Sequence, residues 1–417
     1  MVFLALAASQ APSWATWVGW GAGGLASASL PLCFKFGFGE AEQHQLKAIK
    51  NQVKTSSKQY SFLEMFPPAE TLPCILLSGP RQAVGAHLPH LRFVKALGAG
   101  TYGVVSQYRS NAGEVAVKTM QNFASNHIAA RRCLREINIM KCLKHSNIVS
   151  LKEVVALKEP PTVHLVMELM DGTLYNIICS KEVLGEEHIQ FWIYGILLAL
   201  EYLHGSDVVH RDLKPQNILV NRNCDIKLCD FGLARGPWPD KEASKVDLRT
   251  DYVGTRWYRA PEVLLEAVTH MPSADLWSLG CVLAELTGRS VLFPGSSSLD
   301  QLKKILRIVG TPRHEDCLTH RFSELIQQPA FMFDKQHWGN LFPSATESNL
   351  SLLDGLLQFN PRWRVTARDA LRHVFVSDYF DEADVVKPPT ICWHFDRPTK
   401  LREVLARIAS SSTQTPR

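Results

Sequence analysis

The sequence predicts an α+β protein in which short strands come first and helices follow. Between residues 91 and 168, short valine-rich runs alternate with turn residues, a pattern typical of paired strands. From Ile189 to Leu203, apolar side chains instead recur at the spacing of one helical face. We therefore expect a β-rich part that is followed by a helical part.

The composition describes a globular protein with a substantial core. Of the 417 residues, 46% are hydrophobic and 20% are charged, and a length prior gives about two or three domains. The net charge of +5 is modest and argues against a nucleic-acid partner, which requires a clustered basic face. The 10 cysteines include no C-x-x-C pair, so we expect reduced thiols in a cytoplasmic or nuclear protein.

Two extensions precede the strand-rich region. Residues 1–39 hold a single charged side chain, Lys35, and lack the basic start of a secretory signal. We interpret them as an apolar leader, either disordered or targeting, so membrane or organelle association stays an open alternative. Residues 40–90 are polar and interrupted by prolines, and we interpret them as an extension or linker.

A glycine-rich turn lies at the start of the β-rich part. Gly98, Gly100 and Gly103 form a G-x-G-x-x-G pattern, which dinucleotide-binding folds share. In those folds the glycines open a helix, whereas residues 104–108 and 114–118 read here as two strands joined by a turn. The pattern therefore predicts a glycine hairpin laid over phosphates.

The next elements are a helix and two further strands. Apolar periodicity predicts a helix from Ala129 to Leu143, in which Glu136 is the natural ion-pair partner of Lys118. Strands are expected from Asn147 to Val155 and from Val163 to Met167.

Chemistry-bearing side chains are concentrated between residues 210 and 235. The apolar runs 218–220 and 226–229 flank a polar segment and should pair as a hairpin. This span offers Asp212, Lys214, Asn217 and Asp230, and the hairpin would hold the two carboxylates and the carboxamide around one pocket. Such a group suits magnesium and the phosphates it bridges, because a hard cation takes oxygen ligands.

These motifs resemble those of eukaryotic protein kinases. H-R-D-x-x-x-x-N followed by D-F-G matches the catalytic and magnesium loops, and the glycine hairpin followed by V-A-V-K matches the ATP-binding lobe. The resemblance implies a two-lobed fold, with a small β-rich N-lobe and a larger helical C-lobe, over residues 91–380. Residues 381–417 are then a docking-site extension and tail.

The resemblance also implies roles for individual residues. Asp212 would orient the substrate hydroxyl and accept its proton, while Lys214 would stabilise the γ-phosphate of ATP. Asn217 and Asp230 would hold Mg²⁺, and Glu262 would pair with Arg364. The implied ATP-binding residues are Gly98, Ala99, Gly100, Thr101, Tyr102, Gly103, Val105, Ala116, Lys118, Glu136, Met167, Glu168 and Met170. Because no essential group is missing, a scaffold or pseudokinase is disfavoured.

Within kinases, the chain resembles the MAP kinase group. Thr250-Asp251-Tyr252 is similar to the T-x-Y dual phosphorylation site of that group. Three arginines are expected to bind phosphates there, Arg211 at Thr250, and Arg256 and Arg259 at Tyr252. The resemblance implies protein substrates with Ser/Thr-Pro sites, and activation by an upstream dual-specificity kinase or by autophosphorylation.

Some residues also favour alternatives within the kinases. Gln216 and the run GTYGVV are typical of cyclin-dependent kinases, although the helix around Glu136 lacks their PSTAIRE run. Kinases like the male germ cell-associated kinase also carry T-x-Y. Gly254 takes positive φ freely, which is compatible with a preference for proline after the phosphorylated residue.

An acidic run follows the predicted kinase region. Residues 378–384 hold four acids and two aromatic side chains, and a helix is expected from Lys400 to Ala409. The run resembles the common docking site of MAP kinases. That resemblance implies that Asp381 and Asp384 bind basic-hydrophobic motifs of substrates, activators and phosphatases.

Overall fold

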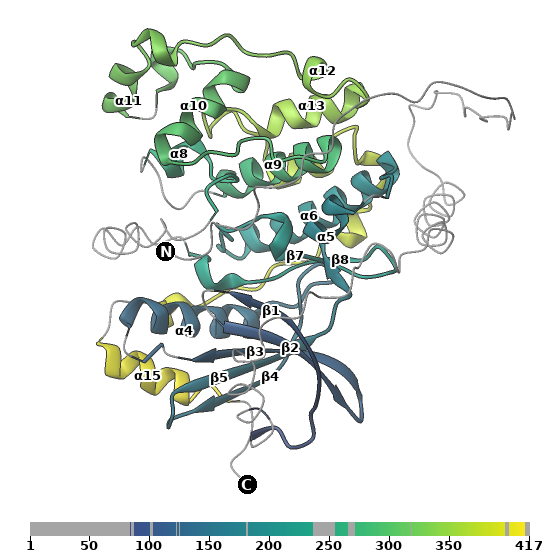
Figure 1. The fold of residues 1–417 in the computed structure, drawn as a ribbon, viewed down its shortest axis with the longest axis vertical. Coiled ribbons are helices and arrows are strands. Elements are labelled where there is room, and N and C mark those ends of the chain that lie inside the picture. The colour runs from purple at the N-terminus through teal and green to yellow at the C-terminus, as the bar shows by residue number, and fades with distance from the viewer. Residues whose placement is uncertain are drawn as a thin grey trace, which may run out of the picture. The chain divides into compact units, whose positions relative to one another are not determined.

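The computed structural model describes residues 84, 87–100, 103–121, 123–124, 126–180, 182–236, 255–265, 272–317, 319–396 and 400–412. A sheet with one long helix forms the N-lobe, and a mainly helical C-lobe follows it in the chain (Figure 1). The predicted α+β fold with two lobes is therefore confirmed.

An antiparallel sheet forms the frame of the N-lobe. Within the described residues it has five strands in the order β1-β2-β3-β5-β4. Their bounds are β1 Arg92–Gly100, β2 Gly103–Ser110, β3 Gly113–Gln121, β4 Leu151–Leu157 and β5 Thr162–Glu168. The central strand β3 is buried from Val115 to Met120, because it has a strand on either side and side chains packed on both faces.

Each face of this sheet is covered by apolar side chains. The helix α4, His127–Cys142, covers one face and begins at Asn126, whose side chain accepts from the backbone N–H groups of Ile128 and Ala129. On the other face, Val84, Leu88 and Leu91 pack with the strand residues Tyr108, Val115, Val117, Val155 and Val166. The packed N-lobe therefore includes residues that precede Leu91.

The connection from α4 to the sheet differs from its prediction. The strand expected from Asn147 begins only at Leu151, because residues 147–149 pair instead with a strand of the C-lobe. The N–H of Leu228 donates to the Asn147 carbonyl at 2.9 Å, and the N–H of Val149 donates to the Leu228 carbonyl at 2.9 Å.

The next residue, Ser150, lies beside the link between the lobes. The backbone N–H of Glu168 donates to the Ser150 carbonyl at 3.2 Å. In return, the Ser150 N–H donates to Oε1 of Glu168 at 2.6 Å. Lys227 lies 3.1 Å from the same oxygen. Ser150 thus bonds the segment before β4 to the link between the lobes.

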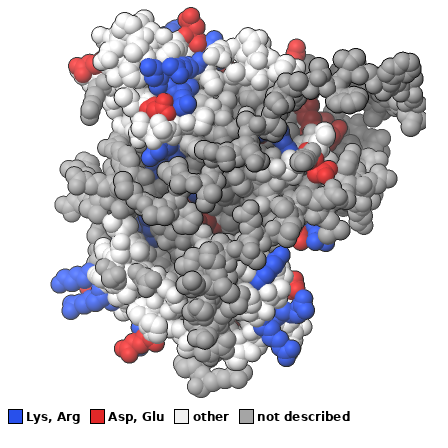
Figure 2. Space-filling view, in the orientation of Figure 1, with Lys and Arg blue, Asp and Glu red and all other residues white. Residues whose placement is uncertain are grey.

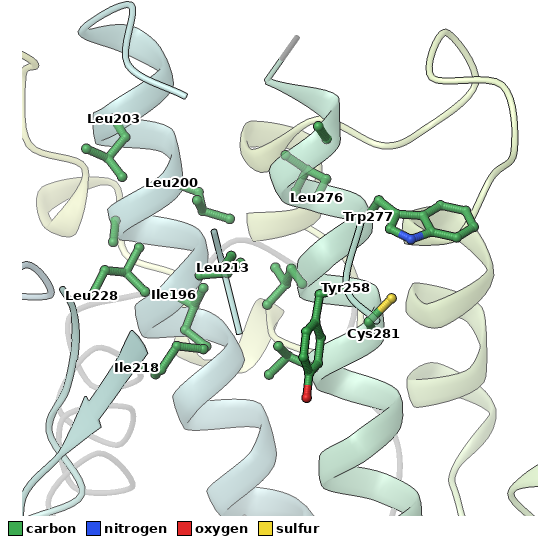
Figure 3. Close-up of a cluster of buried hydrophobic side chains, with 14 of the residues drawn as sticks. Ile196, Leu200, Leu203, Leu213, Ile218, Leu228, Tyr258, Leu276, Trp277 and Cys281 are labelled. Atoms are coloured by element: carbon green, nitrogen blue, oxygen red, sulfur yellow. The ribbon is translucent and has the colours of Figure 1, made fainter. Parts of the chain in front are cut away.

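The C-lobe is built on two buried helices, α6 (Glu186–Gly205) and α9 (Ser273–Gly288). In Figure 3, Leu200 of α6 and Leu276 of α9 lie on facing sides of these helices, and Leu213 lies between them. The other helices described in the C-lobe are α5 Leu174–Cys179, α8 Pro261–Leu264, α10 Ser298–Val309, α11 His320–Leu325, α12 Trp338–Leu341, α13 Glu347–Leu356 and α14 Ala367–Leu371. The 3₁₀ turns described there are η2 Pro215–Asn217, η3 Phe231–Leu233, η4 His314–Asp316, η5 Pro329–Phe331, η6 Ser377–Tyr379 and η7 Glu382–Asp384.

A buried ion pair ties distant parts of the C-lobe. Arg364 donates to both carboxylate oxygens of Glu262, at 2.7 and 3.1 Å, and both side chains are fully buried. Arg364 also donates to the carbonyl of Ser273 at 2.6 Å. The predicted pair is present, and it fixes α8 against the start of α9.

The chain returns to the N-lobe after the C-lobe. The 3₁₀ turn η8, Trp393–Asp396, and the helix α15, Leu401–Ala409, both contact α4, and α15 lies alongside α4 (Figure 1). The predicted helical tail is thus part of the packed N-lobe.

The surface carries no single dominant charge on the face in view. In Figure 2, described basic and acidic side chains occur there in several small groups that are mixed together. None of the described helices has the length and apolar character needed to cross a membrane.

Candidate active site

A small sheet positions the predicted catalytic residues. The strands β6 (Gly172–Thr173), β7 (Ile218–Val220) and β8 (Ile226–Leu228) pair in that order, and β7 and β8 form the expected antiparallel hairpin. The N–H of Cys229 donates to the Asn217 carbonyl at 3.0 Å. That bond places Asn217, at one end of the hairpin, beside Asp230, the residue after Cys229.

The ammonium of Lys118 joins three separate elements. From β3 it donates to Oε1 of Glu136 on α4 at 2.6 Å, and to Oδ1 of Asp230 at 3.1 Å. Burial alone would lower the pKa of Lys118, but these two carboxylates raise it above its usual value. Lys118 therefore stays charged, and the expected ion pair with Glu136 is present.

Asp230 remains a carboxylate in this environment. Burial would raise its pKa, but the ammonium of Lys118 outweighs burial and holds the pKa below its usual value. Its backbone takes a left-handed conformation with φ of 67°, which turns the chain into η3 directly after the carboxylate. Phe231 in η3 is fully buried against the ring of His210 and anchors this turn.

Asp212, Lys214 and Asn217 form a second group, in the loop that precedes β7. Lys214 donates to Oδ2 of Asp212 at 2.7 Å. The amide nitrogen of Asn217 donates to the same oxygen at 2.9 Å and to the Asp212 carbonyl at 2.8 Å. These bonds fix the Asp212 carboxylate through Oδ2, and none of the three involves Oδ1.

The donor set of Asn217 and Asp230 fits a hard divalent cation. Because the amide nitrogen of Asn217 is directed at Asp212, its amide oxygen is directed elsewhere. Asp230 uses Oδ1 for Lys118 and has a second carboxylate oxygen. Magnesium is commonly held by one or two protein oxygens together with phosphates.

The glycine hairpin covers the same side of the sheet as Lys118. Val105 of β2 is in register with Lys118 of β3. At Gly103, with φ of 152°, a Cβ atom would overlap with the carbonyl oxygen of Thr119, so packing requires glycine there. At Gly98 a Cβ atom would meet nothing within 4 Å, so the packing of the chain does not require glycine at that position.

The remaining predicted ATP-binding residues follow the strands to the interlobe link. Ala116 of β3 is in register with Met167 of β5, whose side chain is buried. Glu168 ends β5 and Met170 lies in the link, while Ala99 and Gly100 end β1. Thr101 and Tyr102 lie outside the described residues.

Comparison with known proteins identifies the family. The family described as protein kinase domain matches residues 91–376. Mitogen-activated protein kinase 6 of Arabidopsis thaliana is 39% identical over 313 residues, which cover 73% of this chain and 76% of that protein. The chain belongs to the protein kinase family.

Other relatives refine this placement. Mitogen-activated protein kinase 2 of Arabidopsis thaliana is 40% identical over 308 residues, covering 71% of this chain and 79% of that protein. Mitogen-activated protein kinase 5 of Oryza sativa subsp. japonica is 37% identical over 298 residues, covering 70% and 79%. The chain is therefore an ATP-using serine/threonine protein kinase of the MAP kinase type, a type with protein substrates and upstream kinases.

Two of the kinase's predicted phosphate-binding arginines share a pocket. Arg211 and Arg259 line it together with Leu233, Ala260, Val263, Ala274 and Ser278. Arg256 is directed elsewhere, since it donates to the Ser296 carbonyl at 3.0 Å. The grouping of Arg256 and Arg259 around a phosphate on Tyr252 stays a prediction. Thr250 and Tyr252 lie outside the described residues.

The predicted docking residues are held against α6. The hydroxyl of Tyr194 donates to Oδ2 of Asp384 at 2.7 Å and accepts from the N–H of Asp381 at 3.3 Å. The Asp381 side chain caps η7 by accepting from the N–H of Ala383. Between them, Glu382 accepts from Arg372 at 3.0 Å.

Sequence reasoning missed one functional side chain of the kinase, Asp275. It is fully buried at the start of α9. Its Oδ2 accepts from Nε2 of His204 at 2.9 Å and from the N–H of His210 at 2.8 Å, and its Oδ1 accepts from the N–H of Arg211 at 2.8 Å. Arg211 has a positive φ of 67°, so Asp275 holds a strained backbone just before Asp212. An aspartate within an apolar helical run was the available signal.

We predict that Asp275→Asn lowers both stability and turnover of the kinase. An amide presents a nitrogen donor toward one of the three donors that now face the carboxylate, which costs about 2 kcal/mol. We expect a lower melting temperature. We also expect kcat to change by a larger factor than the KM for ATP. Asp334→Asn, at an exposed position, is the control.

This effect has a defined pH dependence. Burial would raise the pKa of Asp275, but the hydrogen bond from His204 and the neighbouring charges leave it below its usual value. The stabilisation is therefore complete above about pH 4, the ordinary value, and is lost as the pH falls through the lower folded-state pKa. Equal melting temperatures of parent and variant at pH 7 would contradict the assignment.

Proposed function

We propose that this MAP kinase-type enzyme transfers the γ-phosphate of ATP with Asp212 as the base. The observation that carries the proposal is that the hairpin of β7 and β8 brings two charged groups side by side. Lys118, Glu136 and Asp230 form one group, and Asp212 with its bonded partners forms the other. Phosphoryl transfer depends mainly on such positioning and charge stabilisation.

The chemistry follows from these contacts. Asp212 accepts the proton of a serine or threonine hydroxyl, whose oxygen forms the new bond to phosphorus as the bond to ADP breaks. Lys214, fixed on Asp212, stabilises the γ-phosphate. Lys118 contacts the α- and β-phosphates, and Gly98 allows the backbone to approach them. Asn217 and Asp230 would hold Mg²⁺, which would neutralise phosphate charge.

The roles of Asp212 and Lys118 are separable by kinetics. We expect Asp212→Asn to lower kcat by about 10²–10⁴-fold with little change in Mg-ATP affinity, because an amide cannot accept the proton. Lys118→Met should abolish transfer and also weaken ATP binding. Single-turnover phosphorylation and nucleotide titration measure both, with Lys335→Met, at an exposed position, as control. Normal turnover of Asp212→Asn would refute the assigned base.

We further propose that phosphates on Thr250 and Tyr252 activate the enzyme and that substrates carry Ser/Thr-Pro sites. The pocket that Arg211 and Arg259 line supports the first part, since guanidinium groups bind phosphate oxygens strongly. The compatibility of Gly254 with positive φ supports the second. The phosphates come from an upstream dual-specificity kinase or from autophosphorylation.

We expect Thr250→Ala and Tyr252→Phe each to lose about tenfold or more of the stimulated activity, because each removes a bound phosphate. Ser244→Ala, in the same segment of the sequence, should keep it. The assay compares matched Ser-Pro and Ser-Ala peptides. Full activity without either phosphate, or equal rates on the two peptides, would overturn the corresponding part.

We also propose that Asp381 and Asp384 receive basic-hydrophobic docking motifs of substrates, activators and phosphatases. Tyr194 supports this, because its contacts hold both residues on one side of α6. Opposite charge would speed association, and apolar contacts would slow release.

Asp381→Asn combined with Asp384→Asn should weaken binding of a basic docking peptide, and more strongly at low salt. In Asp384→Asn the side-chain oxygen can still accept from the Tyr194 hydroxyl, so we expect the fold to be retained. Glu315→Gln with Glu324→Gln removes equal charge from η4 and α11 and serves as the control. Calorimetric titration measures the affinity, and equal binding by both double variants would refute the docking assignment.

A further inference from the structure

Two arginines at α14 face the acidic run that follows them in the chain. Arg368 lies in α14, and Arg372 directly follows the helix. Arg372 donates from Nη2 to Oε2 of Glu382 at 3.0 Å, and Nη2 of Arg368 lies 3.8 Å from Oε1 of the same carboxylate. Residues four apart in a helix are neighbours on its surface. The carboxylate of η7 between Asp381 and Asp384 is therefore already paired within the chain.

Further contacts hold the two guanidinium groups in place. The guanidinium of Arg372 lies over the ring of Phe380, 5.0 Å from the ring centroid, which is a cation–π arrangement. Nε of Arg368 lies 3.8 Å from Oε1 of Glu201 on α6, so Arg368 lies between acids of two elements. Positive charge is therefore held directly beside the acids to which we assign the docking of basic motifs.

These ion pairs are open to solvent. The side chains of Arg368, Arg372 and Glu382 are 58%, 48% and 62% exposed. An exposed ion pair contributes little free energy, so a partner can replace either member at low cost. Val374 and Val386, which lie close to this segment in the chain, are exposed as well. The segment thus offers a partner charges of both signs and apolar side chains.

We propose that Arg368 and Arg372 are specificity-determining residues of this docking surface. They select a partner segment that carries a carboxylate beside its basic side chains. The partner's carboxylate replaces Glu382 on the two arginines, and the released Glu382 joins Asp381 and Asp384 in binding the basic side chains. The inference rests on the proposed docking role of these two aspartates.

A partner segment with basic side chains alone is disfavoured by the same arrangement. To bind Glu382, it must displace the arginines and place added positive charge beside them. Repulsion of this kind is a common source of specificity between similar partners. An exchange of partners avoids the repulsion, because each charge that is released is paired again.

The test compares two matched peptides on the full chain. Both carry the same basic cluster and the same leucines, and they differ only in having Glu or Gln next to the cluster, a position that is tested on either side of it. We expect the parent to bind the Glu peptide about threefold more tightly at low salt, in line with the strength of an exposed ion pair. Calorimetric titration measures both affinities.

Variants of the arginines show whether they cause the preference. Arg368→Gln with Arg372→Gln should abolish it, and should bind the Gln peptide about threefold more tightly than the parent does, because the repulsion is removed. Arg368→Lys with Arg372→Lys keeps both charges and should keep the preference, which separates charge from packing on Phe380. Arg313→Gln with Arg402→Gln, at exposed positions, removes equal charge elsewhere and should match the parent.

The outcomes separate this inference from the docking role. If Asp381→Asn with Asp384→Asn binds both peptides as the parent does, the docking role itself fails. If that variant binds weakly while the glutamine variant of the arginines keeps the parental ratio of affinities, docking stands and selection by the arginines is refuted. Equal binding of the two peptides by the parent would also refute the selection. Loss of the preference in the lysine variant would make the role of the arginines one of packing and would overturn the inference too.

Discussion

One buried ammonium holds the active site of this kinase together. Lys118 comes from the sheet, Glu136 from α4 and Asp230 from the loop after the catalytic hairpin, and all three meet at hydrogen-bond distance. A buried charge with one partner removed is costly. The helix, the sheet and the loop are therefore fixed relative to one another at Lys118, and the rest of the active site lies around this point.

The sequence predicted the parts of the site that local pattern determines. The spacing of H-R-D, Asn217 and D-F-G in a short span left few ways to fold, and the hairpin of β7 and β8 formed as expected. The pair of Lys118 with Glu136 also followed, because the glycine hairpin, V-A-V-K and the helix that holds Glu136 come in the chain order of the kinase pattern.

Long-range contacts could not be predicted in the same way. Asp275 lies 65 residues beyond His210, from whose N–H it accepts, so the apolar run around this acid indicates that it needs a partner but not which one. Residues 147–149 look like the start of a strand, yet they pair across the lobes with Leu228. Asp396 and Trp393 find their partners only when the tail returns to α4, which periodicity within the tail cannot reveal.

The paired segments between the lobes have a mechanical consequence. Residues 147–149 are bonded to the C-lobe, β4 begins at Leu151 in the N-lobe, and Ser150 between them is bonded to Glu168 at the interlobe link. The segment before β4 and the interlobe link thus meet at one place. Hinge motion is absorbed at a few such positions at the ends of elements. If the two lobes rotate to admit or release nucleotide, we expect the pivot to lie near Ser150 and Glu168, with the glycine hairpin moving further than either.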